Sequence, residues 1–327
     1  MSTAAGPTGV TGVESLLDRG DEFAERGDAR AAISFYQAAL TDARRERALS
    51  PEIVPRLRRA QAFIQERVGE FERTLDQALD GGDALDPTSA LRLRHAADMV
   101  KGRRAIFPQQ PSMFYYPYLA QRQFFERDEF DWAPAFEAAA GDIREELGDL
   151  VGDAVFTPYV EDDPDRPARD FHNLNNNPAW TALYLWKNGT LVREIAERCP
   201  KTMRALEQAP LSSIGKRTPS VFFSRLEPGA HIPPHTGMLN SRLICHLPLI
   251  VPPGCWLRVG NETRQWDDGK LLIFDDSIEH EARNPSGEMR IVLIFDIWRP
   301  ELSAGERAGI SAIFDAIDGF QGPPQSD

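Results

Sequence analysis

The chain has 327 residues, more than one ordinary domain needs, and this length predicts two domains. Hydrophobic residues make up 42% and charged residues 27%, which is the composition of a soluble globular protein. The net charge of −13 argues against binding to nucleic acid or to an anionic membrane through bulk electrostatics.

Three features together predict a cytoplasmic protein. The chain has an odd number of cysteines, namely Cys199, Cys245 and Cys255. Their spacing fits neither a zinc knuckle nor a disulfide framework, which favours a reducing compartment. Residues 1–12 lack the features of a signal peptide and are expected to be disordered. No apolar run reaches the ~18 residues of a membrane span.

Residues 13–100 are predicted to form a helical domain. Apolar residues recur at helical spacing from Val13 to Leu79, with a break at Gly27 and Asp28, and a further helix is expected at 91–99. Small residues followed one turn later by an aromatic residue resemble a tetratricopeptide helix pair. Only one copy is readable, so a plain helical bundle is an equally open interpretation.

Residues 101–165 are predicted to connect this domain to the next and to pack on it. Residues 107–119 are rich in proline and aromatic residues, which is typical of an extended strap over a core. Residues 132–150 have the periodicity of a helix, and residues 162–170 form a polar loop with two prolines.

Residues 166–300 are predicted to form a β domain, and residues 301–327 a final helix and tail. Turn signals separate short apolar runs, the pattern of a β-sandwich or barrel. The strands are expected at 181–186, 220–226, 241–251, 255–259, 271–275 and 290–298, and a helix at 194–206. In the final helix Ser303 and Glu306 form a capping box, and the expected apolar face is Ile310, Ile313, Phe314 and Ile317.

Four of the six histidines lie between residues 231 and 280. Pro233 and Pro234 exclude a helical zinc-binding pair formed by His231 and His235. His235 and His280 are each expected on a loop after a strand, where they could converge on a metal. Non-haem iron sites pair two histidines with a carboxylate, but the middle position here is a glycine, so a structural histidine pair remains the alternative.

The faces of two predicted strands carry unusual polar residues. Arg242 and His246 share one face of their strand with Ile244, while the opposite face is apolar. Arg290 begins the last strand, on the same face as Asp296, which is expected near the rim. A buried arginine needs an anion, so Arg290 predicts a bound anion unless it is an exposed strand-end residue.

These residues fall in one spaced pattern that resembles the aspartyl/asparaginyl β-hydroxylases. The similarity covers roughly residues 170–300, and its most specific block runs from Ile273 to His280. The pattern reads Ser224-x-Leu226-x-Pro228-Gly229-x-His231-x-x-Pro234-His235-x-Gly237, Arg242-x-x-x-His246, Trp266-x-x-Gly269-Lys270-x-x-Ile273-Phe274-Asp275-Asp276-Ser277-x-Glu279-His280 and Arg290. Animal members of this family also carry tetratricopeptide repeats ahead of the catalytic domain.

The resemblance implies an α+β protein in which a double-stranded β-helix of the jelly-roll, cupin-like type binds Fe(II) and the cosubstrate 2-oxoglutarate and uses O2. His235 and His280 then hold the iron, with Gly237 where related enzymes have a carboxylate, and water fills the vacant position. The resemblance assigns cosubstrate binding to Ser224, Arg290, His246, Trp180 and Arg242. Ser224 and Arg290 match the residues for the distal carboxylate, and His246 matches one near the proximal carboxylate. Ile244 replaces a second basic residue, a departure from the family pattern.

Several neighbouring polar residues have simpler interpretations. Asp275 or Asp276 is expected to orient a ligating histidine or to cap the loop, with a fallback ligand as the alternative. His231 is expected to be structural, and His172 lies in a polar loop that either lines an entrance or forms turns.

The predicted reaction is hydroxylation of the β-carbon of an aspartyl or asparaginyl residue, or of a related free or carrier-bound amino acid. The helical region favours a peptide or protein partner. Two other interpretations remain: a non-catalytic helical-repeat scaffold with a degenerate β-helix, and a cupin-like metal-dependent hydrolase. Gly237 disfavours the hydrolase, which would need a complete ligand set. The sequence predicts no oligomeric state.

Overall fold

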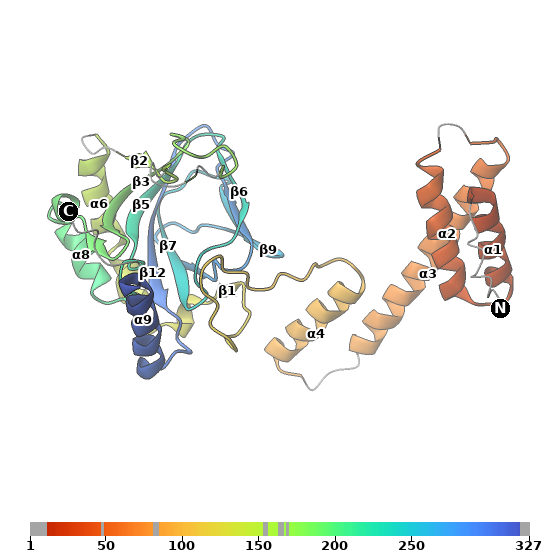
Figure 1. The fold of residues 1–327 in the computed structure, drawn as a ribbon, viewed down its shortest axis with the longest axis horizontal. Helices are drawn as coiled ribbons and strands as arrows, with labels where there is room; N and C mark the ends of the chain where they lie inside the picture. Colours follow the sequence, from red (N-terminus) through yellow and green to blue (C-terminus); the bar gives the residue numbers. More distant parts are fainter. Residues whose placement is uncertain are drawn as a thin grey trace. The chain divides into compact units, whose positions relative to one another are not determined.

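The computed structural model describes residues 12–46, 49–80, 85–152, 156–162, 167 and 170–320. The chain divides into two compact units, with the boundary between Arg104 and Ala105 (Figure 1). The predicted disorder of residues 1–11, the end of the predicted tail and most of the predicted loop at 162–170 lie outside the described residues. Within the described part of the chain, no helix combines the length and apolar character needed to cross a membrane.

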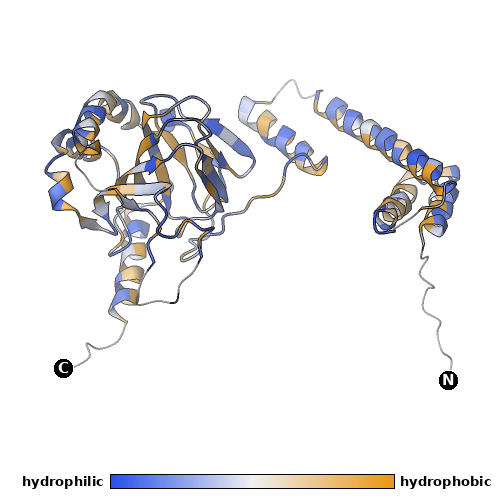
Figure 2. Ribbon diagram, turned by 90° about the horizontal axis from the view of Figure 1, so that it is seen from above, coloured by the Kyte–Doolittle hydropathy of each residue, from blue (hydrophilic) through white to orange (hydrophobic). Residues whose placement is uncertain are grey.

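The first unit is helical, as the periodicity predicted. Its described helices are α1 (Val13–Glu25), α2 (Ala29–Ala43), α3 (Ile53–Asp80) and α4 (Pro87–Val100). Asp28 begins α2, because its carboxylate accepts the amide hydrogen of Ala31 at 3.0 Å. Figure 2 shows apolar and polar residues alternating along these helices. The apolar residues of α1, α2 and α3 form one core that includes Leu17, Tyr36 and Leu57. Its likeness to a tetratricopeptide pair stays a prediction.

The second unit is built on two antiparallel sheets. In the larger sheet the order is β1-β10-β7-β12-β5-β3-β2, with β4 paired to β3, and in the smaller sheet it is β6-β11-β8-β9. The larger sheet contains β1 (Phe124–Phe125), β2 (Thr157–Pro158), β3 (Trp180–Lys187), β4 (Thr190–Leu191), β5 (Val221–Leu226), β7 (Arg242–Ile250), β10 (Leu272–Phe274) and β12 (Arg290–Trp298). The smaller sheet contains β6 (His231–His235), β8 (Trp256–Val259), β9 (Glu262–Gln265) and β11 (His280–Arg283).

The larger sheet is apolar on both faces because a different layer covers each one. One face packs against helices, through a core in which Phe136, Leu147 and Leu206 meet Phe295. The other face and the smaller sheet share a second core. Figure 1 shows α6 and α8 on one side of the larger sheet and β6 and β9 on the other. The helices of this unit are η1 (Arg127–Glu129), α5 (Ala133–Ala138), α6 (Ala140–Val151), α7 (Arg193–Ala196), α8 (Pro200–Leu206) and α9 (Ala304–Gly319). The fold is therefore α+β with a double-stranded β-helix, as predicted.

Some predicted elements differ from the structure. The helix expected at 132–150 is two helices that meet at Ala139, and the helix expected at 194–206 is interrupted at Cys199, just before Pro200. The strand β9 was not predicted. The capping box of α9 is confirmed, but Ile313 and Ile317 are 46% and 45% exposed, so only half of the expected apolar face is buried.

The loop prediction for His235 and His280 was wrong, because both lie in strands of the smaller sheet. Pro233 and Pro234 suggested a loop, since proline cannot donate a hydrogen bond to a neighbouring strand. They are tolerated here because β6 is an edge strand of its sheet.

The strap predicted at 107–119 runs along the loop that follows β6. The amide hydrogens of Ser112 and Met113 are donated to the carbonyls of Gly237 and Met238 at 2.9 and 3.1 Å. Asn240 accepts the amide hydrogen of Tyr116 at 2.6 Å. These bonds fix the position of the segment that follows His235.

Candidate metal centre and adjoining pocket

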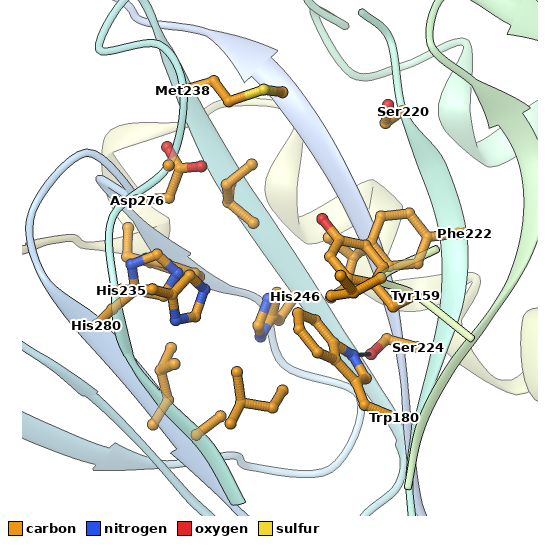
Figure 3. A pocket seen from close by; sticks show the side chains of 18 of the residues that line it. Tyr159, Trp180, Ser220, Phe222, Ser224, His235, Met238, His246, Asp276 and His280 are labelled. Atoms are coloured by element: carbon orange, nitrogen blue, oxygen red, sulfur yellow. Dashed lines mark hydrogen bonds between the residues drawn. The ribbon is translucent and has the colours of Figure 1, made fainter. Parts of the chain in front are cut away.

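His235 and His280 lie opposite each other in neighbouring strands. His235 ends β6, His280 begins β11, and the two residues are partners in the antiparallel register. Their ring centroids are 4.1 Å apart. Figure 3 shows the two rings together at the side of the pocket, between Asp276 and Met238 above and Trp180 and Ser224 below.

Both imidazoles are held in one tautomer. Nδ1 of His235 donates to the carbonyl of Pro233 at 2.8 Å, and Nδ1 of His280 donates to that of Ile278 at 3.1 Å. The lone pair is then on Nε2, the nitrogen available to a metal. Burial lowers the pKa of His235 to about 3 and that of His280 to about 4, so both rings are neutral near pH 7. A neutral imidazole pair suits Fe(II).

Gly237 has no room for a side chain because Asp276 fills the space. A Cβ at this position would overlap the carboxyl group of Asp276. Among the described residues, no three or more histidine, cysteine or acidic side chains form a group that could hold a metal. The protein ligands available at this centre are therefore the two histidines, and Asp276 stands beside them.

A cavity of about 280 Å³ adjoins the histidine pair and extends between the two sheets (Figure 3). All seven site residues predicted from the sequence line it: Trp180, Ser224, His235, Arg242, His246, His280 and Arg290. Asp296 follows Arg290, the first residue of β12, by six residues, a separation of ~20 Å at ~3.3 Å per residue. We call the two parts of the cavity the Arg290 end and the Arg242 end.

The Arg290 end contains a buried cation to which no carboxylate of the described residues is bound. Arg290 is 1% exposed, and its Nη1 lies 3.4 Å from both the carbonyl and the hydroxyl oxygen of Ser224. Its Nε has no hydrogen-bond partner among the described residues. Burial lowers the pKa of Arg290 to about 10, which leaves it charged at neutral pH. An uncompensated buried charge of this kind is costly unless an anion binds there.

Two tryptophans orient the remaining polar groups at the Arg290 end. Trp180 donates from Nε1 to the hydroxyl of Ser224 at 3.1 Å. Trp266 donates from Nε1 to Nδ1 of His246 at 3.3 Å, and its ring lies 4.8 Å from the Arg290 guanidinium. Because Nδ1 of His246 accepts a hydrogen bond, its Nε2 carries the proton and is a donor. Arg290, Ser224 and His246 together form a donor set suited to a carboxylate.

The Arg242 end has the opposite electrostatic arrangement. The Arg242 guanidinium is bound to the carboxylates of both Asp276 and Asp296. All three side chains are buried, including Asp296, so its expected position near the rim was wrong. Burial raises the pKa of both aspartates, and Arg242 opposes that increase. The charge of Arg242 is thus already compensated within the protein.

The rest of the Arg242 end is apolar and aromatic. Tyr159 stacks on Trp180 with ring centroids 4.0 Å apart and lies 5.3 Å from Phe222, which contacts Tyr184 at 5.1 Å. Ile244, Ile294 and Met238 complete this lining. Strand alternation could have found Phe222 and Tyr184, which share faces with Ser224 and Trp180. It could not have found Tyr159, which follows a two-residue strand.

The other polar residues have simpler roles. Asp275 caps the loop before His280 by accepting from the amide of Ser277 at 3.0 Å, which confirms the capping prediction, and it pairs with Arg299 at 2.7 Å. His231 is exposed and pairs with Glu281 at 2.7 Å. Neither His231 nor His172 lines the cavity.

Comparison with known proteins decides the family. The family model described as aspartyl/asparaginyl beta-hydroxylase matches residues 137–300, which is half of the chain. The matched range includes both His235 and His280 and all the residues named above at the Arg290 end. The chain belongs to the aspartyl/asparaginyl β-hydroxylase family. The resemblance seen in the sequence is therefore confirmed.

Two relatives in this family carry different names. The chain is 40% identical to the human aspartyl/asparaginyl beta-hydroxylase over 142 residues, which are 43% of this chain and 19% of that protein. It is 32% identical over 188 residues to the ornithine lipid ester-linked acyl 2-hydroxylase of Rhizobium tropici, covering 57% of this chain and 63% of the relative. The matched part thus spans less than two thirds of either protein. Among solved structures, the Cnp3 cupin domain of Schizosaccharomyces pombe is 11% identical with a TM-score of 0.26, over 40% of this chain and 72% of that one.

Proposed function

We propose that this hydroxylase-family chain is an Fe(II)- and 2-oxoglutarate-dependent dioxygenase. The observation that supports this most is Arg290, a buried cation that pairs with no carboxylate among the described residues and lines the same cavity as two neutral histidines. 2-Oxoglutarate is a dianion that can bind a metal at one end and a cation at the other. The Arg290 end has the charge and the donors that its distal carboxylate needs.

The protein's part in the reaction is to bind and orient. Nε2 of His235 and Nε2 of His280 would hold Fe(II), and the two backbone carbonyls that accept from their Nδ1 atoms keep the lone pair of each ring on Nε2. Bound iron supplies the activation of O2 that no amino-acid side chain provides. Arg290 and Ser224 would bind the distal carboxylate, and Nε2 of His246 would donate to the proximal one.

The reaction balances without a protein acid or base. A substrate C–H, O2 and 2-oxoglutarate give a C–OH, succinate and CO2. One oxygen atom enters the substrate and the other enters succinate, while the cosubstrate and the C–H bond each supply two electrons. The family resemblance implies an aspartyl or asparaginyl side chain, or a related amino acid, as substrate, and the name of the Rhizobium relative specifies an acyl chain.

Arg242 has a different role in this proposal from the one that the resemblance implied. Its guanidinium is bound to Asp276 and Asp296, so it holds Asp276 beside the histidine pair and is not available to the cosubstrate. Ile244 occupies the position where the family pattern has a second basic residue, and it contributes only apolar surface to the cavity.

Succinate formation tests the proposal. Purified full-length protein is mixed with Fe(II), ascorbate and 2-oxoglutarate in air, and succinate is measured against a reaction without iron. In parallel, thermal unfolding with Mn(II) is followed with and without 2-oxoglutarate. Slow uncoupled succinate formation and a 2-oxoglutarate-dependent rise in Tm are expected. Absence of both would refute the dioxygenase and favour the non-catalytic scaffold.

A further inference from the structure

We infer that the Arg242 end binds an aliphatic acyl chain and that the carbon hydroxylated by this chain belongs to it. This inference rests on the proposed function and adds the substrate class. It follows from the charges at the Arg242 end, from its apolar lining and from the residues around its mouth.

The cavity offers a substrate carboxylate no free cation. The cationic side chains among its described lining residues are Arg242 and Arg290. Arg290 serves the cosubstrate, and Arg242 is bound to two carboxylates. An acidic substrate side chain at the Arg242 end would be a third carboxylate beside a single compensated arginine. Like charges in a buried site repel each other, so this end selects against an acid.

The surface that remains at the Arg242 end is suited to hydrocarbon. Phe222, Ile244 and Ile294 are at most 9% exposed, and the rings of Tyr159 and Tyr184 pack against Phe222. Apolar surface of this kind gains most from excluding water around another apolar group. A chain of methylene groups would pack against these apolar side chains and exclude water from them.

Polar groups are found where the cavity opens. Asn188 is exposed and Ser220 is half-buried, and both line the cavity next to the Arg242 end. An ester or amide head group would lie at this opening while its chain enters. Ser220 is already positioned by its amide, which donates to Asp296 at 3.0 Å.

Apolar residues continue from the mouth onto the neighbouring strap. Met238 lines the cavity and is 38% exposed. The strap lies beside it, with the amide of Met113 donating to the Met238 carbonyl at 3.1 Å. Met113 and Tyr115 on this strap are 51% and 52% exposed. A chain longer than the cavity therefore meets further apolar side chains outside it.

In the reaction one methylene C–H of the chain becomes C–OH. The C–H bond supplies two electrons and 2-oxoglutarate supplies two by losing CO2. Both oxygen atoms of O2 are accounted for, one in the new hydroxyl and one in succinate.

Binding to the Mn(II)- and 2-oxoglutarate-loaded full chain, without oxygen, tests the inference. The probes are dodecanoyl-glycine, free dodecanoate and a capped Gly-Asp-Gly peptide, each titrated by calorimetry below its micellar concentration. We expect at least one dodecanoyl probe to bind at least tenfold more tightly than the peptide. Preference for dodecanoyl-glycine identifies an amide- or ester-linked chain, and preference for dodecanoate identifies a free fatty acid. Tighter binding of the peptide would overturn the inference.

Two variants show whether the chain occupies this cavity. Ile244→Arg adds a buried cation at the Arg242 end, and we expect at least a tenfold loss of dodecanoyl binding. Met238→Asp changes an exposed residue at the mouth, so it is tolerated by the fold, and a loss of about fivefold is expected. Leu191→Arg, on the exposed strand β4 outside the cavity, is the matched control and should bind like the parent. Equal binding by the parent and both cavity variants would place the probe elsewhere and overturn the inference.

The 2-oxoglutarate-dependent rise in Tm separates the two proposals. If Ile244→Arg and Met238→Asp keep that rise but lose the dodecanoyl probe, the cosubstrate site is intact and the chain site is the part affected. If the parent protein shows no rise, the proposed function has failed, whatever the acyl probes do.

Discussion

The two ends of the cavity each contain a buried arginine, but the two arginines have opposite electrostatic surroundings. Arg242 contacts two carboxylates of its own chain, whereas Arg290, among the described residues, contacts the uncharged oxygens of Ser224 and the ring of Trp266. The first is a structural ion cluster, and the second is the site that we propose for an external anion. Burial alone therefore does not identify a binding residue, and the decisive property is whether the protein has already compensated the charge.

The largest expected effect concerns the two histidines proposed to hold the metal. His280→Ala removes one of two histidine ligands, and no third protein ligand is available to replace it among the described residues. We expect complete loss of Mn(II) binding at micromolar concentrations, measured by equilibrium dialysis. His231→Ala, on the same strand as His235 but exposed, is the control and should retain the metal. Undiminished binding by His280→Ala would show that the ligand assignment is wrong.

Arg290→Met separates cosubstrate binding from stability. Truncating one partner of a buried charge pair costs roughly 2–5 kcal/mol, so 2-oxoglutarate should bind about 30-fold to several thousand-fold more weakly. Without cosubstrate, the same variant should be more stable than the parent by at least about 1 kcal/mol, because it removes an uncompensated buried charge. Calorimetry and urea unfolding measure the two quantities. A loss of stability would mean that Arg290 is compensated within the protein.

Arg242→Met should have the opposite effect on stability. Asp276 and Asp296 would remain buried without their cation, which is expected to lower the free energy of unfolding by about 3–5 kcal/mol. Folding raises the pKa of both carboxyl groups above the ordinary value of 3.8. Between that value and the pKa in the folded state, the folded chain keeps a proton that the unfolded chain has released. The free energy of unfolding therefore falls as the pH rises from about 3.8 through the folded-state pKa. The loss should therefore be smaller at pH 5 than at pH 7 in urea unfolding. An unchanged stability at both values would contradict the ion cluster.

The smallest effect is expected from single hydroxyl groups at the two ends. Ser224→Ala removes a hydrogen bond to the charged distal carboxylate of about 1.5–3 kcal/mol, which predicts a loss of 2-oxoglutarate affinity of about 10- to 150-fold. Ser220→Ala, at the Arg242 end, should leave that affinity unchanged. Equal losses in the two variants would show that the ends are not distinct.

Much of the site could be predicted because its residues follow strand alternation. Arg242 and His246 were assigned to one face of a strand, and Arg290 to one face of another, and the structure places all three in one cavity. The block from Ile273 to His280 is contiguous, so the family resemblance also singled out His280, which the structure places beside His235. Helical periodicity likewise predicted the first unit, in which α1, α2 and α3 share one apolar core.

The parts that were wrong or missed depend on contacts between distant segments. His235 was expected on a loop because Pro233 and Pro234 cannot donate to a neighbouring strand, and only the position of β6 at a sheet edge resolves that conflict. Trp266 was in the family pattern, but its contacts with His246 and Arg290 were not predicted. These three residues lie in three different segments of the chain, which only the fold brings together.

By itself, the sequence determined the residue types of the site, the order of most strands and the family, because these are local or evenly spaced along the chain. Only the tertiary structure decided which charges are compensated. It placed the Asp276 carboxyl where a side chain at Gly237 would lie, and it paired Arg242 with both Asp276 and Asp296. Among the described residues, no carboxylate pairs with Arg290. Charge compensation depends on distances across the fold, and for that reason the difference between the two ends could not be predicted from the sequence.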